Sequence, residues 1–230
     1  DRTWHTRNAN QVNGNTQTTT SQYKFGSSSA VFDGSGDSIY VGNSAQIPST
    51  SDWTIEGWIR PGAVAGGPYY FIGQCDSSGT ISTAIFGAGI DGNSKLSLTV
   101  YSGSSGYTTS VSATTLSINT WYHIAFVRDG ATIRTYLNGV QQGTVAIGSA
   151  ALNQNGYWCT LGGMGERTVY MFNGHLQDFR IYSGICKYPG GTTFTEPSTF
   201  LPEIENDSYG QYVTLAAQLT GSNGGTSFPI

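Results

Sequence analysis

Three observations predict an all-β fold built from two stacked antiparallel sheets. Segments that alternate apolar and polar residues recur about every eight to twelve residues along the 230-residue chain. Gly, Asn-Gly or Asp-Gly punctuates these segments, and nowhere does an apolar helical period persist over about ten residues. A single open sheet with so many strands would twist too strongly to stay intact, so the strands are expected to divide between two packed sheets.

The clearest element is a three-stranded β-meander over residues 121–143, WYHIAFVRDGATIRTYLNGVQQG. Residues 121–128 and 132–137 are rich in β-branched and aromatic side chains. The dipeptides Asp129-Gly130 and Asn138-Gly139 tolerate the positive φ of a two-residue type I′ turn. The stretch therefore predicts strands joined by two tight hairpins, with Trp121 and Phe126 assigned to packing.

The same alternation predicts the other strands. They are expected over residues 24–32, 38–41, 53–60, 69–74, 80–86, 96–101, 107–113, 140–147, 157–162, 169–172 and 176–182. Trp53 and Trp58 lie five residues apart on one strand, so their side chains must point to opposite faces. One is expected in the core and the other on an outer face or under a covering loop.

Four blocks occur in an order typical of one family. They are residues 27–41 (SSSAVFDGSGDSIYV), residues 53–61 (WTIEGWIRP), the meander over residues 121–143, and residues 174–197 (GHLQDFRIYSGICKYPGGTTFTEP). Together they resemble the laminin-G-like branch of the concanavalin-A-like jelly rolls, of the kind found in phage tail-fibre and other virion or extracellular surface proteins. The resemblance covers residues 22–201 and implies a two-sheet antiparallel jelly roll.

The chain is expected to divide into four parts. Residues 1–21 resemble the second half of the family's opening, residues 22–201 form the jelly roll, residues 202–208 are an acidic linker, and residues 209–230 carry a C-terminal strand. In that strand an apolar set alternates with polar or small residues. The expected assembly strand, projecting from the sandwich and completing the sheet of a neighbouring copy, is carried by Tyr212, Val213, Leu215, Ala217 and Leu219.

Composition limits the partners. Charged residues make up 10% of the chain, the formal net charge is −4, and the ten Lys and Arg residues are scattered. Without a basic run, nucleic acid is not expected as a partner.

No apolar stretch approaches the roughly 20 residues that span a bilayer. Such a Gly-, Ser-, Thr- and Tyr-rich chain is typical of extracellular or virion-surface proteins, and its three widely spaced cysteines are read mainly as buried thiols, with one disulfide as the alternative.

The carboxylate pattern argues against an enzyme. Glycosidases need two acidic groups that flank the scissile bond. The strand WTIEGWIR carries only Glu56, and the closely spaced Glu203 and Glu205 lie in the linker. Gly87, Gly89 and Gly92 match G-x-G-x-x-G, but no helix follows to bind a phosphate, so they are interpreted as turn glycines. No catalytic residue is expected.

The resemblance implies a calcium ion at the rim of the sheets. The matching carboxylates are Asp33 and Asp37 in FDGSGD and Asp178 before the RIY strand. Ca²⁺ takes six to eight oxygen ligands, which three carboxylates and backbone carbonyls could supply. The alternative is that Asp33 and Asp37 only shape a turn and that Asp178 pairs with Arg180 or Arg128.

Aromatic side chains in the loops are the candidate glycan-binding residues. Sugars are commonly bound by an aromatic platform beside amides and hydroxyls, whereas core packing is the alternative for each single ring. The candidates are Tyr69, Tyr70, Tyr101, Tyr107, Tyr157 and Trp158.

Two functions follow from these observations. The first is a non-catalytic building block of an extracellular filament or virion appendage, whose copies are joined by the C-terminal strand. The second is a glycan- or receptor-binding lectin module of a larger tail fibre or adhesin, in which that strand belongs to a tandem domain. Whether the strand pairs within its own chain distinguishes the two.

Overall fold

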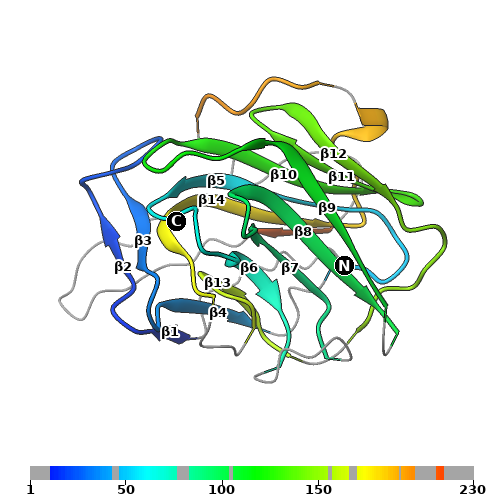
Figure 1. The fold of residues 1–230 in the computed structure, drawn as a ribbon, viewed down its shortest axis with the longest axis horizontal. Coiled ribbons are helices and arrows are strands. Elements are labelled where there is room, and N and C mark those ends of the chain that lie inside the picture. Colours follow the sequence, from blue (N-terminus) through cyan, green and yellow to red (C-terminus); the bar gives the residue numbers. More distant parts are fainter. Residues whose placement is uncertain are drawn as a thin grey trace.

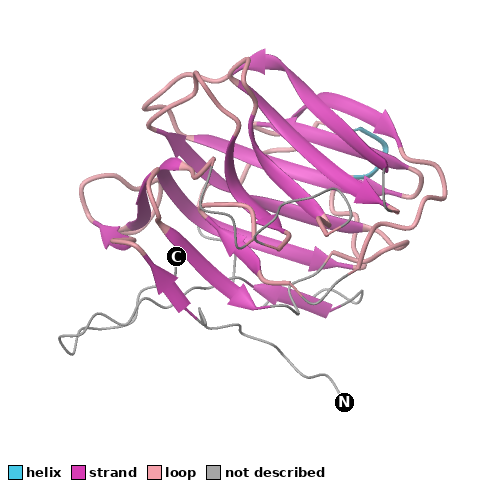
Figure 2. Cartoon of the chain, turned by 60° about the horizontal axis from the view of Figure 1, so that its bottom comes forward, coloured by secondary structure: helices cyan, strands magenta, loops and turns pink. Residues whose placement is uncertain are grey.

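The fold is a two-layer antiparallel β-sandwich (Figures 1 and 2). The structure, a computed structural model, describes residues 11–42, 47–76, 83–103, 106–154, 157–165, 170–191 and 193–199, and the backbone of residues 211–214. Its only helical element among these is the single turn η1 (Pro189–Gly191). The prediction of an all-β jelly-roll sandwich is thus confirmed.

One layer is a seven-stranded sheet. Its spatial order is β1 (Gln11–Asn13), β4 (Ser38–Gly42), β13 (Cys159–Leu161), β6 (Tyr69–Gln74), β7 (Phe86–Ile90), β8 (Lys95–Ser102) and β9 (Gly106–Thr115). Each pairing in it is antiparallel.

The other layer is an eight-stranded sheet. Its spatial order is β12 (Val140–Ala146), β11 (Thr132–Leu137), β10 (Tyr122–Asp129), β5 (Trp53–Pro61), β14 (Asn173–Ser183), β3 (Ser29–Asp33) and β2 (Gln17–Thr19), with β15 (Gln211–Thr214) paired to β14. The meander prediction corresponds to β10, β11 and β12. Asn138 and Gly139 both have positive φ, as a type I′ turn requires, but the first turn uses Gly130 and Ala131 because Asp129 still pairs with Thr132.

The core lies between the sheets and follows the period-two alternation of the strands. Trp53 is buried in it, whereas Trp58 is buried on the outer face of the eight-stranded sheet, so the prediction that the two point to opposite faces is confirmed. Phe126 belongs to the core as expected, but Trp121 is only partly buried. No disulfide joins Cys75, Cys159 and Cys186, which all lie among the described residues, and Cys75 and Cys159 are buried.

Two sequence interpretations are wrong in the region of β7. The strand covers Phe86–Ile90, whereas residues 83–85 of the strand expected over residues 80–86 lie before it and residues 80–82 lie outside the described residues. Gly87 and Gly89 therefore lie inside a strand, and of the three glycines only Gly92 lies in a turn. Phe86, Ala88 and Ile90 point into the core, and the two glycines therefore face outward.

No strand forms at residues 170–172, where Met171 makes only an isolated bridge to Tyr70. The rest of that expected strand lies outside the described residues.

The N-terminal described residues are part of both sheets. β1 pairs with β4 and β2 pairs with β3, so each forms an edge of its sheet. The division into four segments stays a prediction, because residues 1–10 and 200–210 lie outside the described part of the chain.

The expected projection of the C-terminal strand is corrected by the structure. β15 pairs antiparallel with β14 of the same chain, with Val213 opposite Ile181 and Tyr212 opposite Tyr182. β3 pairs with the first half of β14, at residues 173–176, and β15 continues along the same edge at residues 180–183. The strand fills an edge of its own domain because β3 is too short to cover it. Leu215, Ala217 and Leu219 lie outside the described residues.

No helix in the described part of the chain is long and apolar enough to cross a membrane.

Candidate functional site

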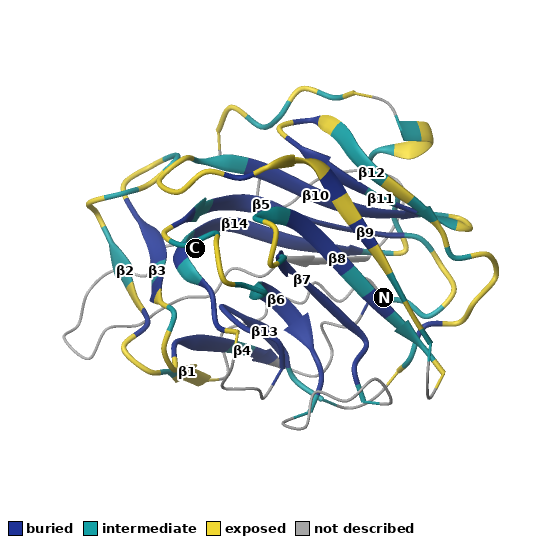
Figure 3. Cartoon of the chain, in the orientation of Figure 1, coloured by how far each residue is buried: buried dark blue, intermediate teal, exposed yellow. Residues whose placement is uncertain are grey.

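The two outer faces of the sandwich differ in what lies on them, and in the eight-stranded sheet β5, β10 and β14 are mostly buried (Figure 3). A covering segment, defined as residues 184–196 with Thr192 outside the described residues, crosses the outer face of the eight-stranded sheet (Figure 1). Its Tyr188 and Phe194 rings stack 3.5 Å apart and pack with Cys186 against Ala125, Val127 and Tyr136. This covering explains why the outward residues of β5 and β10 beneath it are buried.

Backbone groups fix the covering segment along its length. The Thr54 hydroxyl donates to the Ile185 carbonyl at 2.9 Å and accepts from the Lys187 amide at 3.0 Å. The Tyr136 hydroxyl donates to the Tyr188 carbonyl at 3.0 Å, and the Phe194 amide donates to the Gly139 carbonyl at 3.0 Å. The segment is therefore attached to β5, to β11 and to the turn between β11 and β12.

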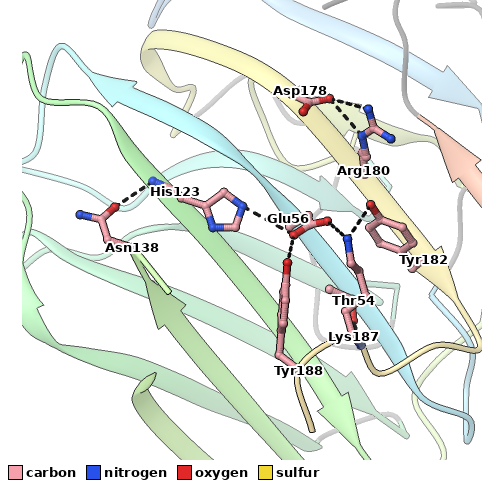
Figure 4. Close-up of polar contacts among 9 residues, drawn as sticks. All are labelled: Thr54, Glu56, His123, Asn138, Asp178, Arg180, Tyr182, Lys187 and Tyr188. Carbon is pink, nitrogen blue, oxygen red and sulfur yellow. Dashed lines mark hydrogen bonds and ion pairs between the residues drawn. The ribbon is translucent and has the colours of Figure 1, made fainter. Parts of the chain in front are cut away.

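Glu56 lies under this segment at the centre of a polar network (Figure 4). Its side chain is fully buried. Lys187 Nζ donates to Oε1 at 2.7 Å, and the Tyr188 hydroxyl donates to Oε2 at 2.6 Å. His123 Nε2 lies 3.5 Å from Oε2, and Lys187 Nζ also donates to the Tyr182 hydroxyl at 3.0 Å. Donors from the same chain thus occupy both carboxylate oxygens.

The network keeps Glu56 ionised. Burial by itself raises the pKa of Glu56, but the interactions with His123 and Lys187 outweigh it and hold the pKa at about 2. A glycosidase acid needs the opposite, a raised pKa that keeps the proton available at working pH. The arrangement therefore anchors the covering segment and does not suit Glu56 to proton transfer.

Asp178 stands at an irregular point of β14. The register shifts between Gln177 and Arg180, and Asp178 has a φ of 52°, so Phe179 can still point into the core. The Asp178 Oδ1 atom accepts from Arg180 Nε at 3.0 Å and from Nη2 at 2.9 Å, and both side chains are buried (Figure 4). This is the ion pair that the sequence left open as the alternative to calcium.

Asp33 and Asp37 share one turn. Asp37 Oδ2 accepts from the Asp33 amide at 2.8 Å, and Asp33 Oδ1 accepts from the Ser35 amide at 2.7 Å. Among the described residues, no group of three or more His, Cys, Asp or Glu side chains is arranged to hold a metal ion. The structure does not gather the three predicted ligands, and calcium binding stays a prediction that thermal melts with excess calcium and with excess chelator would test.

The outer face of the seven-stranded sheet carries three pairs of aromatic rings. Ring centroids lie 5.7 Å apart for Tyr40 and Trp158, 6.5 Å for Tyr70 and Tyr170, and 6.1 Å for Tyr101 and Tyr107. In order across the sheet, the pairs lie at β4 and β13, at β6, and at β8 and β9. We call these six residues the aromatic face.

Glycines make room for the middle pair. A Cβ atom at Gly87 would lie 3.0 Å from the Tyr70 ring and 2.9 Å from Met164 Sδ, so both side chains rest directly on the backbone of β7. Tyr70 and Tyr101 also pack on a small cluster of Cys75, Ala84 and Met164. The rings are therefore held by packing from below.

Hydroxyl groups and exposed ring surface lie beside the third pair. Thr99 and Thr109 pair by register next to Tyr101 and Tyr107, and their hydroxyls are 2.9 Å apart. Tyr107 is 60% exposed and Tyr170 is 46% exposed, so both rings can contact a ligand. Aromatic surface beside hydroxyls suits the apolar and polar sides of a sugar.

Four of the six predicted ligand-binding residues lie together. Tyr70, Tyr101, Tyr107 and Trp158 lie on the aromatic face, whereas Tyr69 packs against the core and its hydroxyl donates to the Ala65 carbonyl at 2.8 Å. For Tyr157 the structure gives a contact of its backbone, whose carbonyl accepts from the Gln74 side-chain Nε2 at 2.6 Å.

Tyr40 and Tyr170 are not among the residues predicted from the sequence. Tyr40 alternates with the core residues Ile39 and Val41 on a predicted strand, so its outward direction could have been derived from the alternation. Tyr170 has a φ of 60°, a conformation that no sequence pattern signalled for a tyrosine.

Comparisons with known proteins agree with this architecture. The family model of the concanavalin A-like lectin/glucanases superfamily matches residues 33–186, more than half of the chain. No curated protein sequence matches.

Among solved structures, domain 4 of AbnA, a GH43 extracellular arabinanase from Geobacillus stearothermophilus in complex with arabinotriose, is similar. It is 19% identical with a TM-score of 0.57, over 79% of this chain and 82% of that chain.

Two toxin domains have the same TM-score of 0.57. The binding domain of Paraclostridial Mosquitocidal Protein 1 is 18% identical, over 75% of this chain and 43% of that chain. The botulinum neurotoxin serotype D ligand-binding domain in complex with N-acetylneuraminic acid is 14% identical, over 75% of this chain and 42% of that chain. This chain thus spans less than half of either toxin domain, and at such identities the likeness concerns the fold.

Proposed function

Because the chain belongs to the concanavalin A-like lectin/glucanases superfamily, we propose that it is a non-catalytic carbohydrate-binding domain that acts outside the cell. The observation that carries the proposal is the aromatic face, with three ring pairs in order across one sheet. Neighbouring strands are about 4.8 Å apart, so a face reaching from β4 to β9 is long enough for an oligosaccharide of several sugars.

The structural neighbours support the ligand class. One was solved with arabinotriose and another with N-acetylneuraminic acid. The buried, ionised Glu56 supports a binding role over a hydrolytic one, since its oxygens are engaged within the chain. A place on a virion surface or in a tail fibre remains a narrower version of the same proposal.

Binding to immobilised neutral polysaccharides, including arabinan, galactan and β-glucan, tests the proposal. Replacing Tyr107 by Ala removes an exposed ring and is expected to weaken binding about tenfold, which corresponds to roughly 1.4 kcal/mol. Tyr23→Ala is the matched control, because Tyr23 is 45% exposed but precedes β3 of the other sheet. Equal losses in both variants, or no binding by the wild type to any of the glycans, would contradict the proposal.

Strand-linked filament assembly is the competing function, and the pairing of β15 with its own β14 argues against it. Truncation after Glu205 distinguishes the two. If the strand belongs to its own domain, the truncated protein is a monomer with lower stability, because about four residues of edge pairing are lost. An intact protein that forms filaments, and a truncated protein that cannot, would support the assembly function instead.

A further inference from the structure

A second group of partly exposed side chains lies on the outer face of the eight-stranded sheet, at the end of β5 far from Thr54. The strand register puts Gln17 opposite Val31, Val31 opposite His175, and His175 opposite Arg60. Trp121 comes directly before β10, whose first residue pairs with Ile59. These five residues form a line across β2, β3, β14, β5 and the start of β10, which we call the Arg60 row.

The row is open to solvent. Gln17 is exposed and the other four members are partly exposed, in contrast to the buried Glu56 on the same face. The Trp121 and His175 rings lie 6.3 Å apart, tilted by 53°. Because β5 runs between β10 and β14, Arg60 lies between Trp121 and His175 in the register of the sheet.

The hydrogen bonds of Ser29 determine which ring nitrogen of neutral His175 carries the proton. The Ser29 hydroxyl donates its single proton to the Gln22 carbonyl at 2.6 Å, so at its 3.2 Å contact with His175 Nδ1 it must accept. The neutral imidazole therefore carries its proton on Nδ1, and Nε2 is the atom that gains a proton. Protonation would add a second cationic donor beside Arg60.

Arg60 is the charged side chain that acts on His175. Arg60 on β5 has no carboxylate partner among the described residues, and Lys24 lies on the same face, 4.1 Å from the Trp58 ring. On the neighbouring elements, His123 and Glu56 are buried against each other, and Asp33 at the end of β3 accepts from the Ser35 amide. Burial and then the charge of Arg60 lower the pKa of His175. An anion placed here would relieve that unfavourable charge.

We propose that the Arg60 row binds a carboxylate-bearing sugar, such as a uronic acid unit of an acidic glycan. The guanidinium of Arg60 presents a fork that matches a carboxylate, the Trp121 ring offers a surface for the sugar, and protonated His175 Nε2 donates a further hydrogen bond. The row is separate from the aromatic face, which lies on the other sheet. Ligand binding at the two sites can therefore be tested independently, and a negative result at one does not decide the other.

The proposal gives affinity a definite pH dependence. A bound carboxylate favours protonated His175 and raises its pKa, so binding takes up a proton. Affinity is therefore highest below the pKa of His175 in the free protein and falls as the pH rises through the pKa of the complex. The dependence should disappear when position 175 cannot titrate.

Calorimetry with oligogalacturonate and its fully methyl-esterified form tests the proposal, with the His175 resonances followed by NMR. The acid oligomer should bind about tenfold or more tightly than the ester, and Arg60→Gln should remove most of that difference, because the charged fork that holds the carboxylate is lost. His175→Gln should still bind the acid oligomer at high pH but lose the increase at low pH. Acetate should bind more weakly than the oligomer, because it offers no ring surface to Trp121.

Two control variants show whether an effect is specific to the Arg60 row. Lys95→Gln removes a cation from the other sheet and should change nothing, and Tyr107→Ala should spare the acid oligomer while weakening neutral glycans. Should Arg60→Gln fail to fold, Arg60→Lys retains the charge without the fork and should bind the acid oligomer more weakly than the wild type. Equal affinity for acid and ester, an unchanged pKa of His175 on binding, or acetate binding as tight as the oligomer would overturn the proposal.

Discussion

The outer faces of the two sheets have opposite relations to solvent. Under the covering segment, Glu56 lies at the centre of a network in which the donors come from the same chain. On the aromatic face, exposed rings lie beside threonine hydroxyls. Both faces follow the same strand alternation, so the difference comes from what packs on each. An acidic residue on a sheet face therefore indicates a site only if no segment of the chain has already occupied it.

Removing the cation of the Glu56 network should have the largest effect on stability. Lys187→Met leaves a fully buried carboxylate without its closest positive partner, and breaking a buried pair costs about 3–5 kcal/mol. Urea denaturation would measure the loss. Lys95→Met, on the other sheet, is the control and should stay within about 0.5 kcal/mol of the wild type.

The double variant Lys187→Met with Glu56→Gln adds a second test of the same network. It removes both charges, so it should recover much of the stability that the single Lys187 variant loses. If Lys187→Met costs no more than Lys95→Met, the network does not hold the covering segment.

Acid should act on the same network with a somewhat smaller effect. The pKa of Glu56 falls from its ordinary 4.5 to about 2 in the folded protein. Because the pKa of Glu56 is lower in the folded than in the unfolded protein, ionised Glu56 stabilises the fold at pH values above the unfolded-state pKa. This contribution is lost as the pH falls from about 4.5 through about 2. It amounts to on the order of 3 kcal/mol. Urea titrations across this range should show a steeper loss in the wild type than in Glu56→Gln, and parallel curves would contradict the assignment.

A glycine substitution tests how the aromatic face is supported. Gly87→Ala places a Cβ 2.9 Å from Met164 Sδ and 3.0 Å from the Tyr70 ring, and such overpacking costs about 1–3 kcal/mol. It should also weaken glycan binding, because Tyr70 must move. Gly92→Ala is the matched control, since its nearest neighbour is 3.7 Å away and its φ is unstrained. A Gly87→Ala protein with wild-type stability and binding would show that the ring does not depend on this contact.

The strands that sequence predicted best are those whose signals are local. The strands over residues 69–74 and 132–137 are confirmed residue for residue, because alternation and turn glycines lie within the segments themselves. Gly87 and Gly89 lie in a strand although glycine usually marks a turn. Met164 and the Tyr70 ring occupy the space that a side chain at Gly87 would need, and the backbone of Tyr69 and Tyr70 occupies it at Gly89.

The candidate site was harder to predict, because its environment depends on contacts between residues that are far apart in the sequence. That Glu56 is covered by Lys187 and Tyr188 depends on a segment about 130 residues away in the chain, which alternation cannot place. Trp121 was assigned to packing because large rings usually fill cores, but it lies just outside the strand and beside His175. By contrast, Tyr70, Tyr101 and Tyr107 were found because each adjoins a recognisable strand. The sequence pattern thus identifies aromatic residues in or beside strands, but it does not show which outer face of the sandwich stays exposed to solvent.

The smallest effect is expected in hydrolysis assays. Glu56→Gln should leave the hydrolysis of arabinan, galactan and β-glucan unchanged, because the wild type is expected to have none. A glycosidase acid must donate a proton near neutral pH, while the pKa of Glu56 is about 2 and both of its oxygens accept hydrogen bonds within the chain. The wild type and the variant should be compared by reducing-sugar release, at a temperature where denaturation curves show both to be folded. Release of sugar by the wild type that disappears in Glu56→Gln would make the covered face an active site and would reverse the contrast between the two sheets.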